Sequence, residues 1–318
     1  TVSGGQIEDF SGSGTTYTAN FYPTVKLVDT TIDIGTGKFT DAVGNSNTTA
    51  ATQFKWNYDG QKPLMSITGV KRVSPWGFVD NYNYQITTAS LDEGDITNSE
   101  YIVFTLKADE AITNFTANDI SATGGTITNF NGSGDTYTAR FYPSNDGLKG
   151  VQVRSDLFTD LVGNTNNATL EFNFTSDRTQ PRLQSASSSP ETFYRSDYMN
   201  GIGMRRSNAT SIDVEVVFNE EVIGFDSSNF YTWNSNINSF SGSGTTYNYT
   251  VVPTNTSSND QYTSASINAY STGNYITDLA GNVAHTYLDQ YLGTLYESPG
   301  DVYFISDKVA PSVFIESS

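Results

Sequence analysis

The sequence contains no cysteine and only one histidine, His285. Without cysteine the chain has no disulfide framework, no thiolate metal site and no thiol nucleophile. No nucleophile motif such as G-x-S-x-G surrounds His285, and we interpret this residue as a solvent-facing loop or strand position. The acidic residues are scattered, and no pair of them is marked out as a glycosidase-like pair. We therefore expect a protein that is not an enzyme.

Basic residues are scarce, with 16 Lys and Arg against 34 Asp and Glu and a formal net charge of −18. Such a surface repels nucleic acid and anionic lipid and attracts divalent cations, so we expect no nucleic-acid partner. No apolar run reaches the length that spans a membrane, and the opening residues TVSGGQIEDF lack the charged and apolar regions of a signal peptide. We expect no membrane insertion in this segment.

No stretch keeps a sustained 3.6-residue apolar period, so helices are not expected. Aromatic residues make up 13% of the chain, with 20 Tyr and 19 Phe, and Thr, Ser, Asn and Gly are frequent. This composition favours strands and turns. The expected class is all-β, and 318 residues are enough for two or three domains.

A phrase of seven residues occurs three times. SGSGTTY stands at 11–17 and again at 241–247, and NGSGDTY stands between them at 131–137. Each phrase belongs to a longer matching segment: 2–23, 122–143 and, more loosely, 233–253. The glycines suit a tight reversal between two strands. We interpret the phrase as a hairpin turn followed by the start of a core strand.

Two further markers follow the phrase in the same order in each copy, which indicates an internal repeat. The first is a seven-residue segment: FTDAVGN at 39–45, FTDLVGN at 158–164 and ITDLAGN at 276–282. The second is an Asp-x-x-x-Pro exit: DGQKP at 59–63, DRTQP at 177–181 and DKVAP at 307–311.

Alternation of apolar and polar residues predicts strands within each repeat. In TYTARFY at 136–142, Tyr137, Ala139 and Phe141 share one face. The predicted core of the central repeat consists of Tyr137, Phe141, Val151, Val153 and Phe172. The exit prolines mark units of 118 and 130 residues, each with about seven strands. Short alternating strands at this length indicate a β-sandwich.

The order of these segments resembles the bacterial Ig-like repeats of giant surface adhesins. The resemblance rests on DEAITNFTANDI (109–120), GGTITNF (124–130), GSGDTYT (132–138), FTDLVGN and the Asp-x-x-x-Pro linker, and it covers nearly the whole chain. It implies tandem Ig-like β-sandwich domains joined by short linkers, at an extracellular or cell-surface location. The chain departs from the pattern by longer segments after the first strand of each complete repeat.

The repeat markers divide the chain into four parts. We predict the C-terminal half of a repeat at 1–59, a complete repeat at 60–177, a complete repeat with longer loops at 178–307, and a linker with a first strand at 308–318. The simplest explanation is a segment of a much longer repeat chain. The alternative is a filament subunit in which residues 312–318 complete the half repeat of a neighbouring copy by strand donation.

Acidic positions of the repeat predict calcium at the junctions. In an Ig-like sandwich, the turn after the second strand, the turn before the last strand and the arriving linker share one pole. Two groups of carboxylates are expected to meet there: Asp59, Glu110 and Asp160, and Asp177, Glu220 and Asp278. Calcium suits such oxygen ligands, and the resemblance implies the same ion. The alternative is that the aspartates only shape turns and end strands.

The longer segments at 70–85 and 190–206 combine aromatic and basic residues. Their candidate interaction residues are Trp76, Phe78, Tyr82, Tyr84, Tyr194 and Tyr198. These rings fit a protein contact or surface glycans, or they cover the edge of their own sandwich. The leading hypothesis is a non-catalytic stalk whose partners are adjacent repeats or neighbouring copies. The second is a carbohydrate- or receptor-binding module.

Overall fold

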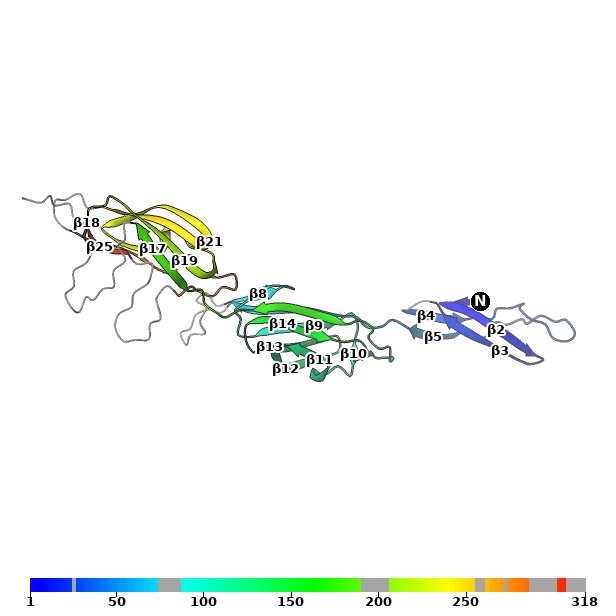
Figure 1. The fold of residues 1–318 in the computed structure, drawn as a ribbon. Helices are drawn as coiled ribbons and strands as arrows, with labels where there is room; N and C mark the ends of the chain where they lie inside the picture. The colour runs from blue at the N-terminus through cyan, green and yellow to red at the C-terminus, as the bar shows by residue number, and fades with distance from the viewer. Residues whose placement is uncertain are drawn as a thin grey trace, which may run out of the picture.

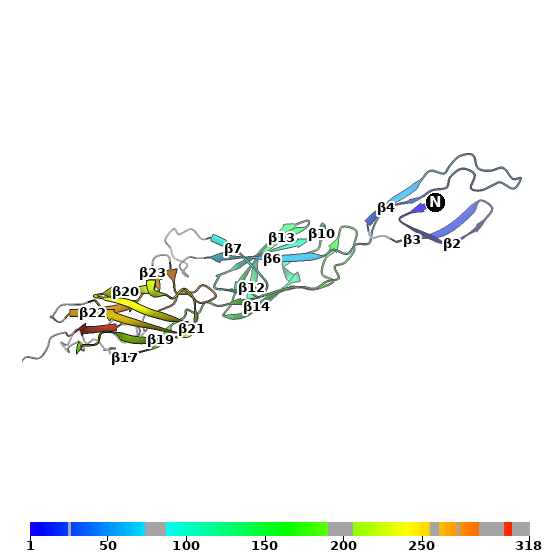
Figure 2. The same cartoon turned by 90° about the horizontal axis from the view of Figure 1, so that it is seen from above.

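The computed structural model describes residues 1–24, 27–73, 87–189, 206–254, 261–271, 274–285 and 302–306. Within them the only helices are two three-residue 3-10 turns, Ala117–Asp119 and Ser227–Asn229. The expected all-β class is confirmed. In the described parts no helix is both long and apolar enough to cross a membrane. Three bodies follow one another in a row: the N-terminal strands β1 to β5, the strands β6 to β16, and the strands β17 to β25 (Figures 1 and 2).

The central repeat is a sandwich of two sheets. The first sheet has the order β12-β13-β9-β6-β7. Its strands are β6 Met65–Val73, β7 Thr87–Leu91, β9 Ile102–Ala108, β12 Gly125–Ser133 and β13 Thr136–Pro143. The second sheet has the order β11-β14-β16-β8. Its strands are β8 Ile96–Thr97, β11 Ile120–Thr123, β14 Gly147–Val153 and β16 Leu170–Ser176. A short pair, β10 Ile112–Thr113 with β15 Thr159–Asp160, completes the repeat.

The two sheets contain nine strands, so the expectation of about seven was too low. The additional strands come from the long stretch between β6 and β9. There the chain forms β7 antiparallel to β6, and then the two-residue strand β8 parallel to β16. Both lie at sheet edges, where a short strand adds backbone hydrogen bonds without changing the core.

The predicted core of the central repeat is confirmed. Tyr137, Phe141, Val151, Val153 and Phe172 are all buried. Apolar and polar residues alternate along β13, as a strand with one buried face requires. Phe104 lies among the aromatic rings, with centroids 6.3 Å from Phe141, 5.2 Å from Phe172 and 6.2 Å from Phe174.

The third body repeats this arrangement. One sheet has the order β17-β19-β21, with β17 Leu183–Ser189, β19 Ile212–Val222 and β21 Ser235–Pro253. The other has the order β18-β25-β22-β20, with β18 Arg206–Ser207, β20 Phe230–Trp233, β22 Gln261–Ile267 and β25 Val302–Ser306. A short pair joins β23 Tyr270–Ser271 to β24 Asn274–Tyr275. The core includes Phe218, Phe225 and Tyr249. The predicted first strand at 312–318 lies outside the described residues.

The N-terminal body contains counterparts of only five of these strands. β1 Val2–Ser3, β4 Leu27–Ile32 and β5 Phe54–Asp59 form one sheet, like β11, β14 and β16. β2 Gly5–Ser13 and β3 Thr16–Pro23 form a hairpin whose pairing matches that of β12 and β13. Within the described residues of this body, no strand occupies the places of β9 and β6 beside the hairpin.

Apolar side chains of this body are exposed where the complete repeat buries them. Tyr17 is 55% exposed, whereas its counterpart Tyr137 is 6% exposed. Phe54 is 63% exposed, against 6% for Phe172. The side chains that would form the core of the N-terminal body are thus exposed to solvent.

A peptide of residues 1–59 is therefore expected not to fold on its own. Half a sandwich leaves one core face and the edge of β3 uncovered, so burial does not offset the loss of chain entropy. Circular dichroism during heating should show no cooperative transition. A monomeric peptide with a cooperative melt would contradict this prediction.

Candidate metal centres at the repeat junctions

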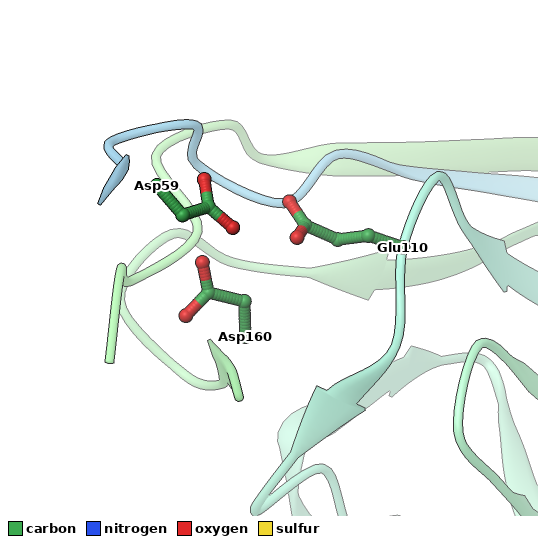
Figure 3. Close-up of side chains that lie close together, drawn as sticks. All are labelled: Asp59, Glu110 and Asp160. Atoms are coloured by element: carbon green, nitrogen blue, oxygen red, sulfur yellow. The ribbon is translucent and has the colours of Figure 1, made fainter. Parts of the chain in front are cut away.

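Three carboxylates meet where the N-terminal body joins the central repeat (Figure 3). Asp59 ends β5, Glu110 follows β9, and Asp160 ends β15. One oxygen from each carboxylate lies within 4.8 Å of the other two. Asp160 is buried, and the other two are partly buried. The structure thus brings together the three residues that sequence reasoning assigned to this junction.

Asp160 is held by its own turn. Its Oδ1 accepts hydrogen bonds from the backbone N–H groups of Val162, Gly163 and Asn164, at 2.9, 2.7 and 2.8 Å. Its Oδ2 accepts a bond from the Asn164 side chain at 2.7 Å. Burial raises the pKa of Asp160, but these hydrogen bonds outweigh it, and the net shift is downward. Asp160 is therefore an ionised carboxylate in a fixed orientation.

Asn164 links the turn to the linker. Its side-chain amide donates to the backbone oxygen of Asp59 at 3.1 Å. Asp59 in turn accepts a bond from the backbone N–H of Gln61 at 2.9 Å. Sequence reasoning missed this role of Asn164. The available indication was that an asparagine ends the seven-residue segment in all three copies, as Asn45, Asn164 and Asn282.

Glu110 is the unsatisfied member of the group. Its Oε1 is buried and has no hydrogen-bond partner among the residues that the structure describes. Burial, followed by the charges of Asp59, Asp160 and Asp109, raises the pKa of Glu110. A buried acceptor without a donor is costly, and a hard cation is one partner that would satisfy it.

The junction between the central and third repeats has the same arrangement. Oxygens of Asp177, Glu220 and Asp278 lie within 4.8 Å of one another. Asn282 donates to Asp278 Oδ2 at 2.7 Å and to the backbone oxygen of Asp177 at 3.0 Å. Burial, followed by the charges of Asp177 and Asp278, raises the pKa of Glu220. Burial also raises the pKa of Asp177, against the hydrogen bond from Thr179.

The N-terminal body has the same turn without the cluster. Asp41 accepts bonds from the backbone N–H groups of Val43 and Asn45, at 3.0 and 2.9 Å, and from the Asn45 side chain at 2.9 Å. Asp41 is exposed, and no acidic group of three forms around it among the described residues. The aspartate therefore shapes its turn by itself, as the alternative interpretation stated. The clustering at the junctions is a second feature, which comes from the linker and the glutamate.

The pH profile of the metal-free protein follows from these shifts. The raised pKa values of Glu110 and Glu220 mean that the native state binds their protons more tightly than the unfolded chain does. Their contribution to stability is complete below about pH 4.3 and is lost as pH rises through the raised values. The lowered pKa of Asp160 acts in the opposite sense, since its contribution is lost as pH falls below about 3.9.

In a chelator, we therefore expect a higher melting temperature at about pH 4.5 than at neutral pH. Scanning calorimetry of the full chain measures this difference. The double variant Glu110→Gln/Glu220→Gln is the control, since it removes the two glutamates with raised pKa values and leaves only Asp177 with a raised pKa at the junctions. An equal difference in that variant would assign the effect to Asp177 or to the overall negative charge instead.

The remaining candidates lie away from the junction clusters or outside the described residues. Trp76, Phe78, Tyr82, Tyr84, Tyr194 and Tyr198 all fall outside the described residues. His285 is partly buried, and its backbone pairs with Arg182. The backbone N–H of His285 donates a hydrogen bond to the backbone oxygen of Pro181 at 2.7 Å. The histidine thus belongs to the strand pairing at the start of the third repeat.

Comparison with known proteins identifies the central repeat. A family model described as a bacterial Ig-like domain matches residues 83–176. Among solved structures, the chain is similar to the crystal structure of invasin, described as a bacterial integrin-binding protein, with 13% identity and a TM-score of 0.30. The match covers 76% of this chain and 57% of the invasin chain. No curated protein matches the sequence.

The family match spans the strands from β7 to β16, which include most of both sheets and most of the core. The resemblance to bacterial Ig-like repeats is thereby confirmed for this part of the chain. The central repeat of the protein is a bacterial Ig-like domain.

Proposed function

We propose that this chain is a non-catalytic structural segment of an extracellular, adhesin-type surface protein, and that calcium stiffens its junctions. The bacterial Ig-like domain supports the surface location in outline. The row of three bodies supports a stalk, because the described parts of the bodies follow one another end to end (Figures 1 and 2). A stalk of this kind needs resistance to bending at its linkers.

One observation carries the proposal: the same three-carboxylate group occurs at both junctions. Each group takes one residue from the incoming linker and two from the following repeat. Carboxylates this close repel one another unless protons or a cation lie between them. The unpartnered Oε1 of Glu110 fits a calcium ligand.

Asp59, Glu110 and Asp160 would hold the ion at the first junction, and Asp177, Glu220 and Asp278 at the second. A bound cation would supply attraction between the linker and the repeat where the metal-free protein has repulsion. The Asn164 and Asn282 side chains already tie each turn to its linker. The ion would add to these hydrogen bonds and limit hinge motion.

The sheet order favours the stalk over strand donation. Residues 312–318 correspond in sequence to the strand that follows Pro63, which is β6 in the central repeat. In that repeat β6 does not touch the hairpin, because β9 lies between β6 and β13. A donated strand in the β6 place would therefore leave the edge of β3 unpaired. Completion of the N-terminal body requires a β9 counterpart as well.

Small-angle scattering tests the proposal. The full chain should show its longest maximum dimension in calcium, and a broader, more compact distribution after chelation. Asp160→Asn should reproduce this change at the first junction and leave the second unaffected. Asp41→Asn is the matched control, because it removes the same turn aspartate where no cluster forms. Identical scattering with and without calcium, with ion removal verified by elemental analysis, would count against stiffening by calcium.

A further inference from the structure

The outer face of the first sheet of the central repeat is positively charged, although the chain as a whole has a net charge of −18. Along β6, β9 and β13, alternate side chains point away from the core. Three of these outward residues are cations: Arg72, Lys107 and Arg140. None of the outward positions on these three strands carries a carboxylate. We call this surface the basic face.

Arg140 is available to a partner. Its guanidinium lies 4.8 Å from the ring centroid of Tyr101, and that of Arg72 lies 5.1 Å from the same ring. Arg72 also pairs with Glu100 at 3.3 Å. The guanidinium of Arg140 has no hydrogen bond or ion pair with any residue in the described ranges. The tyrosine thus supports a guanidinium whose N–H donors remain open to an anionic partner.

The equivalent face of the third repeat is negatively charged. Position for position, Asp213 replaces Val103 and Glu215 replaces Thr105, while Thr250 replaces Arg140. These residues line a shallow groove of about 380 Å³ together with Ser187, Ser189 and Asn248. Asp213 accepts a hydrogen bond from Thr250 at 2.9 Å. The carboxylate of Glu215 has no hydrogen-bond or ion-pair partner within the described part of the chain. We call this surface the acidic face.

We propose that the basic face of one chain binds the acidic face of a second copy, so that neighbouring chains associate side by side. The two faces have opposite charge and belong to equivalent sheets of successive bodies (Figures 1 and 2). Because the bodies follow one another in a row, contact between these faces joins separate chains. A second copy is the partner chosen because its acidic face has the charge opposite to that of the basic face. The proposal is independent of the junction clusters and of calcium.

The contact is expected to be weak. Three strands about 4.8 Å apart and about seven residues long present roughly 350 Å² per face. The total of roughly 700 Å² is well below the roughly 1,200 Å² of a stable interface. Repeated copies along a stalk would strengthen it through multivalency.

Salt should act in two directions. At low ionic strength the large negative charge of both chains keeps them apart, and at high ionic strength the local attraction between the faces is screened. At physiological ionic strength the Debye length is about 8 Å, so the contact survives while the long-range repulsion is reduced. Association should therefore pass through a maximum at intermediate salt.

Sedimentation velocity on a concentration series of the full chain tests the proposal. The basic-face variant is Lys107→Glu/Arg140→Glu, and the acidic-face variant is Asp213→Arg/Glu215→Arg. Each should associate roughly tenfold more weakly than the original chain, as expected when exposed attractive pairs become repulsive. An equimolar mixture of the two variants should recover association, because the altered faces are again complementary. The control variant Lys55→Glu/Arg154→Glu has the same change in charge as the basic-face variant but at positions outside both faces. Its association should be as strong as that of the original chain at the salt concentration where each associates most.

Four results would overturn the proposal. These are no association of the original chain at any salt concentration, an equal loss in the control variant, no recovery in the mixture, and association unaffected by both face variants. Binding of alginate that requires Arg140, without self-association, would assign the basic face to acidic polysaccharide and equally reject a second copy. A melting temperature close to that of the original chain confirms that a variant is folded. If a charge-reversal variant does not fold, the single variants Arg140→Gln and Glu215→Gln replace the basic-face and acidic-face variants.

Discussion

Replacing Phe158 with alanine is expected to destabilise the central repeat by about 3–5 kcal/mol, the usual cost of emptying a buried phenylalanine site. Phe158 is 1% exposed, and its ring centroid lies 5.4 Å from that of Phe115. Phe115 in turn packs against Tyr137 at 5.1 Å. Removal of the ring therefore opens a cavity within a group of aromatic side chains. Urea unfolding of the central repeat measures the change.

Phe39→Ala provides a control at the equivalent position. Both phenylalanines begin the seven-residue segment, and both have their backbone N–H bonded to an asparagine side chain, Asn47 for Phe39 and Asn166 for Phe158. Phe39 is nevertheless 61% exposed. Its replacement should change stability by less than about 0.5 kcal/mol, as for other surface positions. Equal effects of the two substitutions would show that burial at these positions differs from the structure described.

The core and the hairpins of the first two copies were predictable from the sequence because they depend on local patterns, whereas the third copy of the phrase, 241–247, lies within the single strand β21. Alternation along TYTARFY determines which face of β13 is buried, and Tyr137 and Phe141 are buried as expected. The second glycine of the repeated phrase takes a positive φ in each copy, as at Gly14 and Gly134 with φ of 64° and 66°. The local turn therefore also follows from residue type. These features require no knowledge of distant contacts.

Other features depend on how separate segments pack, and the sequence does not encode them in a local pattern. The bond from Asn164 to Asp59 joins residues 105 positions apart and exists only because the linker runs past the turn. The basic face combines Arg72 and Arg140, which come from two strands on either side of β9. Its charge becomes evident only when the strand order is known.

The carboxylate groups are an intermediate case. Recurrence of the acidic positions in successive repeats suggested that they share a location, but their approach to within 4.8 Å required the geometry of the sandwich. The same geometry explains why Asp41 stands apart from such a group, since no glutamate counterpart lies beside it in the described N-terminal body. The position of the turn is thus a property of one repeat, whereas the cluster is a property of a junction.

Saturating calcium is expected to raise the melting temperatures of the central and third repeats, and chelation is expected to lower them. An ion that binds only the native state at a hundredfold excess over its Kd adds about 2.7 kcal/mol per site. Glu110→Gln should show two opposite effects. It should remove the calcium-dependent gain of the central repeat, because one ligand is lost. It should also stabilise the metal-free form, because an unfavourable buried charge with a raised pKa is replaced by a neutral amide.

Glu220→Gln should act in the same way on the third repeat alone, since the two junctions share no residue. Glu8→Gln removes one charge from the exposed face of the N-terminal hairpin and is the control for net charge. Calorimetry of the four proteins with calcium and with chelator separates the outcomes. If chelation leaves every melting temperature unchanged while elemental analysis shows that the ions are gone, the carboxylates serve only to shape turns. A Glu110→Gln variant that is less stable than the original chain in chelator would show that Glu110 makes favourable contacts without any ion, because a merely repulsive carboxylate would be better replaced by an amide.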